Sequence, residues 1–145
     1  VQLAGDGQDA GVRRSQHRMD REFSRVDETI AMAAVYAANH LERVAGMVCL
    51  TESGTTALRM SRLSSGLPIY ALSRHPEIVR RMCLYRGVRP ILFDYTVCAA
   101  GEVAQEAVNE LQRRGLVRAG ERLILTRGDL LGVGGSTTTL KIVEL

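Results

Sequence analysis

The sequence predicts an α/β domain with three layers, α/β/α, in which helices cover both faces of a mostly parallel five-stranded sheet whose last strand is antiparallel. Two observations carry this prediction. Short apolar runs alternate with segments whose apolar residues recur every three or four positions, and turn residues separate them. The chain has 145 residues, of which 46% are hydrophobic, so it can bury one core but is too short for two ordinary domains.

We expect residues 1–20 to be a linker from a preceding domain and residues 21–145 to be the α/β domain. The first stretch is rich in glycine and polar residues and has no apolar periodicity. From Phe23 onward apolar side chains recur at intervals of three and four, which predicts a long helix that ends near Ala45.

The rest of the domain alternates strands with helices. The predicted strands are short apolar runs bounded by turn residues, namely 47–50, 69–72, 91–93 and 123–126. The predicted helices have one apolar face and end at glycine or serine, namely 56–63, 76–87 and 101–114. Right-handed crossovers of this kind place helices on both faces of a parallel sheet.

The last strand, residues 138–145, is predicted from alternating apolar and polar side chains. It follows a glycine-rich loop of about ten residues without a helical pattern, and such a link is too short for a usual parallel crossover. We therefore expect this strand to run antiparallel to its neighbour.

Composition excludes several classes of protein. The net charge is only +3, no block of like charges is longer than a pair, and aromatic residues make up 4%, which argues against nucleic-acid binding. No apolar stretch approaches the roughly 20 residues of a membrane span. Three cysteines without a CxxC pair indicate neither zinc nor a disulfide framework, so we expect a cytoplasmic protein. The single lysine, Lys141, lies in a predicted strand and excludes a P-loop.

A candidate phosphate site follows the first strand, where the chain enters the second helix. Its residues are small, hydroxylated or acidic: Thr51, Glu52, Ser53, Gly54, Thr55 and Thr56. Backbone N–H groups, hydroxyls and a glycine that permits close approach suit a phosphate group at the carboxyl edge of a parallel sheet. The alternative is that Ser53 or Thr55 merely caps the helix.

A second candidate segment follows the fourth strand and is expected at the same edge of the sheet. Its residues are Gly128, Asp129, Gly132, Gly134, Gly135, Ser136 and Thr137. The glycines do not have the spacing of a dinucleotide-binding loop that opens a helix. The segment either closes over a ligand held by the first loop or is simply a turn.

No set of residues indicates catalysis or a resident metal or other cofactor. His17, His40 and His75 are far apart in sequence, and we expect capping or surface roles for them. Arg74 stands at a strand end, where its guanidinium can reach an anion. For acid–base chemistry near the two loops, the candidates are only Glu52, Arg74 and Asp129.

Several ordered motifs resemble one known family. They are 28–41 (ETIAMAAVYAANHL), 50–58 (LTESGTTAL), 64–75 (SSGLPIYALSRH), 84–93 (LYRGVRPILF) and the tail from Gly128 to Ile142. Together they resemble the C-terminal domain of pyruvate kinases over the stretch from Arg18 to Leu145. The resemblance is nearest to the bacterial form that responds to AMP and sugar monophosphates.

This resemblance implies an effector-phosphate loop at 51–56, a flexible loop at 128–137 that closes over the effector, and a homotetramer in which these domains meet across a twofold axis. Thr55 stands where similar loops often carry a basic residue. The family transfers a phosphoryl group from phosphoenolpyruvate to ADP, the last step of glycolysis. Its domains that bind phosphoenolpyruvate, ADP, magnesium and potassium precede this segment, so the chain alone is expected to be inactive. The alternative is a purely structural oligomerisation module that binds no effector.

Overall fold

The computed structural model describes residues 25–63, 65–128 and 137–145. The elements in chain order are α2 (Val26–His40), β1 (Val44–Leu50), α3 (Thr55–Ser61), β2 (Ile69–Ser73), α4 (Pro76–Met82), β3 (Val88–Leu92), the 3-10 turns η1 (Tyr95–Val97) and η2 (Ala100–Glu102), α5 (Val103–Arg113), β4 (Arg122–Gly128) and β5 (Thr137–Glu144). The linker 1–20 and His17 lie outside the described residues.

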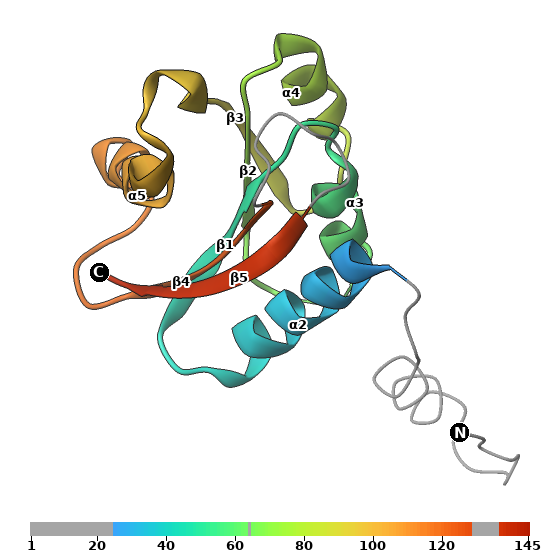
Figure 1. The fold of residues 1–145 in the computed structure, drawn as a ribbon. Helices are drawn as coiled ribbons and strands as arrows, with labels where there is room; N and C mark the ends of the chain where they lie inside the picture. Colours follow the sequence, from blue (N-terminus) through green and yellow to red (C-terminus); the bar gives the residue numbers. More distant parts are fainter. Residues whose placement is uncertain (1–24, 64, 129–136) are drawn as a thin grey trace, which may run out of the picture.

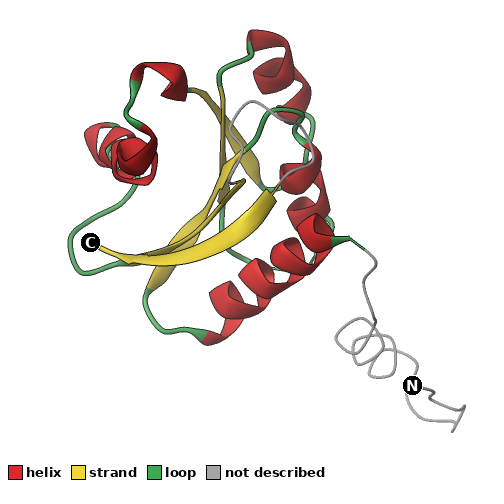
Figure 2. Cartoon of the chain, in the orientation of Figure 1, coloured by secondary structure: helices red, strands yellow, loops and turns green. Residues whose placement is uncertain are grey.

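The strands form one sheet with the order β3-β2-β1-β4-β5. The first four strands are parallel, and β5 runs antiparallel to β4. Helices α2, α3 and α4 lie on one side of the sheet, and α5 lies on the other (Figures 1 and 2). The predicted three-layer fold and the antiparallel last strand are confirmed.

Each face of the sheet has its own apolar core, because successive side chains of a strand point to opposite faces. In β1, Met47 and Cys49 belong to the core beneath α2, α3 and α4. The next residue of the same strand in each case, Val48 or Leu50, belongs to the core beneath α5. Complete burial raises the pKa of the Cys49 thiol to about 12, so this cysteine is a neutral core residue.

The first helix is shorter than its sequence pattern predicts. The prediction extended it to residue 45, but α2 ends at His40. Leu41 has extended backbone angles and Arg43 has a φ of 63°, so the chain turns there and Val44 already begins β1. Gly46 lies where β1 passes the chain before β2, since a Cβ on it would lie only 2.9 Å from the Pro68 carbonyl oxygen.

The segment from residue 76 to residue 93 also differs from the prediction. Helix α4 ends at Met82 rather than near Gly87, which has a φ of 73° in the following turn. Strand β3 begins at Val88, three residues earlier than predicted. Arg89 and Pro90 hid this start, because neither is typical of a buried strand. Both are compatible with an edge strand, which is where β3 lies.

The strand order creates a switch point between β1 and β4. From β1 the chain moves to β2 and β3, and helix α5 then brings it back to β4 on the other side of β1. Helix α3, which follows β1, lies on one face of the sheet, and α5, which precedes β4, lies on the other. Ligands of doubly wound sheets bind at such a point. The turn after β1, residues 51–54, lies there together with Thr55 and Thr56, which the structure places in the first turn of α3. Gly128 at the end of β4 lies there as well.

Candidate functional site

The loop after β1 is a compact turn held by its own side chains. Thr51 is buried, and its Oγ1 accepts a hydrogen bond of 2.9 Å from the N–H of Gly54. Gly54 has a φ of 81°, a conformation that side chains disfavour, and a Cβ there would lie 3.3 Å from Cγ of Met82. The turn therefore depends on glycine at this position and on a hydroxyl at Thr51.

The capping alternative stays open for Ser53, whose hydroxyl accepts the N–H of Thr55, the first residue of α3. Gly54, the N-cap residue, supplies no side-chain cap. Ser53 donates a hydrogen bond of 2.9 Å to Oγ1 of Thr55 and accepts one of 3.3 Å from the Thr55 N–H. Both side chains are only partly buried, so their hydroxyls can exchange these bonds for bonds to a ligand.

A hydrogen bond links the two segments that the sequence placed at the same edge. The hydroxyls of Thr56 and Thr137, which are 81 residues apart in sequence, lie 2.8 Å from each other and are buried. Thr137 is the first residue of β5 and pairs with Gly128, the last residue of β4. The prediction that Gly128 and Thr137 belong to a loop is wrong, because they form the last residue pair of the β4–β5 ladder, at the carboxyl end of β4.

The remaining predicted residues of that loop cannot be placed. Asp129, Gly132, Gly134, Gly135 and Ser136 lie outside the described residues. The structure thus brings residues 51–56 together with the two ends of the glycine-rich segment, Gly128 and Thr137.

A charged cluster stands at the edge of the same loop. Nε of Arg74 donates to Oε2 of Glu52 at 3.1 Å, and Nη2 donates to Oε1 at 3.1 Å. His75 donates from Nε2 to Oε1 of the same carboxylate at 2.8 Å. The Arg74 guanidinium also lies over the Tyr95 ring, 5.7 Å from its centre. Arg74 and His75 follow the carboxyl end of β2, and Tyr95 lies in η1, after β3.

Electrostatics keeps Glu52 and Arg74 ionised. Burial alone would raise the pKa of Glu52, but hydrogen bonds from Arg74 and His75 outweigh burial and lower it below its usual value. The hydrogen bond from Arg74 to Glu52 raises the pKa of the guanidinium. Glu52 is therefore a carboxylate at neutral pH and is held as an ion-pair partner, which does not suit a general base.

The sequence reasoning only partly anticipated this cluster. It gave Arg74 a role toward anions, but the anion that the structure shows is Glu52 of the candidate loop itself. It gave His75 a capping or surface role, and the capping role is wrong because His75 precedes α4 without a side-chain cap. His40 is exposed at the end of α2 and stacks on Tyr36, in line with a surface role. The signal for the cluster was position, since Arg74 and Tyr95 each follow the carboxyl end of a strand.

A cavity of about 490 Å³ lies elsewhere, at the opposite edge of the sheet. It is lined by the ends of α2 and α3 and by residues before β2 and β3, including Arg62 and Arg86. It lies at the amino ends of β2 and β3, away from the carboxyl edge where doubly wound sheets bind their ligands. We therefore place the candidate site at the switch point, where loops and hydroxyls converge, and not at this cavity.

Within the part of the chain that the structure describes, no three His, Cys, Asp or Glu side chains are grouped so that they could hold a metal ion. Among the same residues, no helix is both long and apolar enough to pass through a membrane.

The fold and these loops define a doubly wound α/β domain with a candidate anion site at the carboxyl edge of its sheet. Comparison with known families then identifies it. The family model described as pyruvate kinase, alpha/beta domain, matches residues 28–143. The chain belongs to the pyruvate kinase family and corresponds to its C-terminal α/β domain.

Curated relatives carry the same family name. The chain is 50% identical over 132 residues to "Pyruvate kinase II" of Salmonella typhimurium, and 45% identical over 134 residues to "Pyruvate kinase" of Buchnera aphidicola subsp. Baizongia pistaciae; each alignment covers 90% of the chain and 27% of the relative. It is 44% identical over 127 residues to "Pyruvate kinase" of Haemophilus influenzae, with 87% of the chain and 26% of the relative covered. The chain thus spans about a quarter of the length of these relatives.

Proposed function

We propose that this chain is the regulatory and assembly domain of a cytoplasmic pyruvate kinase. The whole protein would transfer a phosphoryl group from phosphoenolpyruvate to ADP, with magnesium and potassium bound outside this chain. The names of the relatives support this activity. The alignment covers only 27% of each relative, and the remaining part is long enough to contain a catalytic domain. Phosphoryl transfer needs carboxylates that hold a metal, and no three His, Cys, Asp or Glu side chains are grouped as such a site among the described residues.

The effector would be a phosphate monoester such as AMP or a sugar monophosphate, bound at Thr51, Glu52, Ser53, Gly54, Thr55 and Thr56. One observation carries this proposal: the loop after β1 and both ends of the glycine-rich segment meet at the switch point of the sheet, where Thr56 bonds Thr137. A ligand held there would lie beside the loop after β1 and the two described ends of the glycine-rich segment. A ligand that binds one arrangement of them better than another shifts the protein toward that arrangement.

Ligand titration of the chain and of its Ser53→Ala variant tests the proposed effector site directly. Isothermal titration calorimetry of the 145-residue chain with AMP and with glucose 6-phosphate is expected to show binding of at least one of them. Ser53→Ala is expected to weaken it about ten- to a hundredfold, because a hydroxyl that donates to a charged phosphate contributes roughly 1.5–3 kcal/mol.

Ser61→Ala is the matched control, since Ser61 lies at the far end of α3 and its hydroxyl bonds the Leu58 carbonyl. It is expected to leave ligand binding unchanged. The competing hypothesis, a structural module without an effector, requires that neither ligand binds the chain or the whole protein. It also requires that Ser53→Ala and Thr56→Ala leave activation of the whole enzyme as it was.

Assembly into a homotetramer would use the outer edge of β5. Among the described strands β5 pairs with β4 alone, so no other described strand covers its outer edge. The opposite edge strand, β3, carries Pro90, which lacks an N–H donor. A second copy related by a twofold axis can pair with β5 through the same backbone groups on both sides.

Ile142 on β5 offers a test of this interface, since 48% of its surface is exposed. Ile142→Asp in the whole protein is expected to convert tetramers into smaller species in light scattering, because a charge then faces its own copy across the axis. Glu77→Gln on exposed α4, which changes a charge away from β5, is the control and is expected to keep the tetramer. A tetramer that withstands the Ile142 change would exclude β5 as the interface.

A further inference from the structure

We propose that Arg74 is a cationic contact of the effector site and that Glu52 competes with the ligand for it, so that the site selects phosphate monoesters over weaker anions. This inference rests on the proposed function, because it concerns the same loop. It adds a residue outside that loop, Arg74, and it gives Glu52 a role opposite to that of the hydroxyls around it.

The Glu52 carboxylate pairs with Arg74 in the same two-pronged geometry that a bound phosphate would adopt. Arg74 presents Nε and Nη2 side by side to the two carboxylate oxygens of Glu52, at 3.1 Å each. A guanidinium recognises phosphate with the same two donors and the same spacing. Glu52 therefore occupies the face of Arg74 that a phosphate group would use.

Arg74 is held in place independently of Glu52. It follows β2, the neighbour of β1 in the sheet, and the backbone N–H of Thr51 donates to the carbonyl of Leu72 at the end of that strand. Its guanidinium rests over the Tyr95 ring, and Tyr95 is only 4% exposed. Removal of Glu52 would leave a positioned and partly buried cation at the edge of the loop.

The site needs such a cation, because its own loop supplies none. Residues 51–56 contain hydroxyls, one glycine and the acid Glu52, and Thr55 carries no charge. Helix α3 has only seven residues, so its dipole adds little attraction for an anion. Hydroxyl groups carry no net charge. By themselves they do not favour a phosphate monoester, whose charge is near −2, over other polar ligands.

Glu52 has a second partner that makes the exchange possible. His75 holds its Oε1 at 2.8 Å, so the carboxylate need not lose all its hydrogen bonds when it leaves Arg74. A ligand must displace Glu52 from Arg74. Its apparent affinity therefore equals its intrinsic affinity multiplied by the fraction of molecules in which Arg74 is free. A dianion gains more from the guanidinium than a monoanion does and therefore displaces Glu52 more readily. The exchange thus excludes phosphodiesters and simple carboxylates.

The test compares variants of the 145-residue chain by isothermal titration calorimetry with inorganic phosphate, with AMP and with cyclic AMP, a phosphodiester. Glu52→Gln keeps the size and polarity of the side chain but removes its charge, and it is expected to bind phosphate and AMP about tenfold more tightly than the wild type. Arg74→Gln is expected to bind them more weakly, and the double variant is expected to show no gain. Wild-type chain is expected to discriminate against cyclic AMP.

Glu110→Gln is the matched control, because Glu110 also pairs with arginines but lies on α5, away from the loop. It is expected to bind as the wild type does. Thermal unfolding of each variant, followed by circular dichroism, checks that it is folded, and Glu52→Asp offers a second variant in which a shorter carboxylate is expected to release Arg74 in part.

Each outcome decides the inference. A Glu52→Gln chain that binds phosphate no better than the wild type overturns it, as does a gain that persists in the double variant. If the wild type binds AMP and Glu52→Gln adds nothing, the proposed function stands and the inference fails. If Glu52→Gln binds but the wild type does not, the internal competitor is supported in its strongest form. If no variant binds any probe, the effector site and the inference fall together.

Discussion

Replacement of Leu125 by alanine is expected to lower the free energy of unfolding of the chain by about 2–5 kcal/mol. Leu125 is fully buried in β4, between β1 and β5, and belongs to the core under α5. The change removes three buried carbon atoms' worth of contacts and leaves a cavity among strands that pair on both sides. Since small domains have a total stability of roughly 5–15 kcal/mol, this loss is a large part of it.

Urea denaturation followed by circular dichroism measures this effect. Leu84→Ala is the matched control, because Leu84 is the same residue type but is 86% exposed after α4. It is expected to change the free energy of unfolding by less than about 0.5 kcal/mol. Equal losses in the two variants would contradict the placement of Leu125 in the core.

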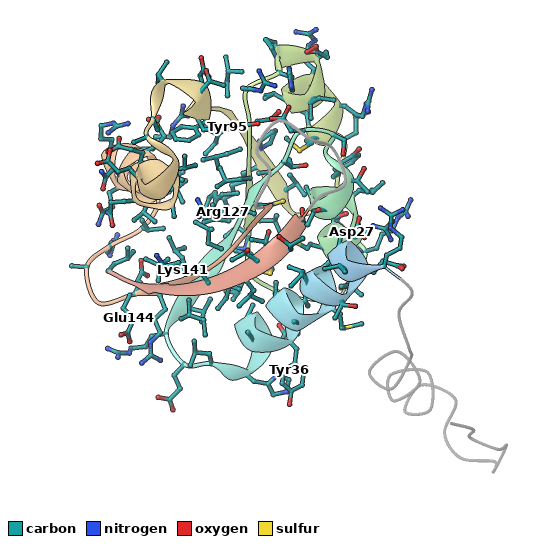
Figure 3. All side chains as sticks on the ribbon, viewed as in Figure 1. Asp27, Tyr36, Tyr95, Arg127, Lys141 and Glu144 are labelled. Carbon is teal, nitrogen blue, oxygen red and sulfur yellow. The ribbon has the colours of Figure 1, made fainter. Side chains whose placement is uncertain are left out.

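Asp27→Asn is expected to cost about 1–3 kcal/mol at neutral pH, the second large effect. Asp27 lies at the start of α2 beside α3 (Figure 3) and is only 2% exposed. Its carboxylate accepts two hydrogen bonds of 2.9 Å from Arg25 and one of 2.9 Å from the N–H of Glu28. Nε of Arg59, on α3, lies 3.7 Å from the second oxygen. An amide cannot compensate these cations.

The same carboxylate makes stability depend on acid pH. The hydrogen bond from Arg25 is the main cause that lowers the pKa of Asp27 in the folded state, and it outweighs burial, which acts in the opposite direction. A carboxyl whose pKa is lower when folded contributes its stability above the ordinary aspartate pKa of about 3.9. That contribution is lost as the pH falls through the lower, folded pKa.

Urea denaturation at pH 7 and at about pH 3 therefore separates two effects. The wild type is expected to lose more stability on acidification than Asp27→Asn, which no longer has this group to protonate. Glu110→Gln, at a more exposed ion pair on α5, is expected to cost less than about 1 kcal/mol at pH 7. An Asp27→Asn chain as stable and as acid-sensitive as the wild type would show that the network is not a source of stability.

The Asp27 network also extends to the helix that follows the candidate effector loop. Arg59 belongs to α3, the helix that starts at the candidate effector loop, and it also bonds Glu28 at 3.1 Å. The loop, α3 and the first turn of α2 are thus joined by direct contacts. For a variant of this network, the free energy of unfolding should be measured before any change in ligand binding at the loop is interpreted, because both depend on the same contacts.

Much of the fold was predictable from sequence because it depends on patterns within single elements. Apolar spacing of three or four in residues 103–111 and apolar runs such as 47–50 identify helix and strand without any knowledge of their neighbours. The short link before residue 138 was enough to predict an antiparallel last strand. The loop at 51–56 was recognisable because it joins a strand to a helix.

The relations between elements, in contrast, were decided by the tertiary structure alone. The end of α2 depends on the left-handed turn at Arg43, which no apolar spacing reports. The pairing of Glu52 with Arg74, 22 residues away, requires β2 to lie beside β1, and the bond from Thr56 to Thr137 requires β4 and β5 to lie on the other side. Periodicity describes which face of an element is apolar, but it does not encode the order of strands in a sheet. The candidate site is built from that order.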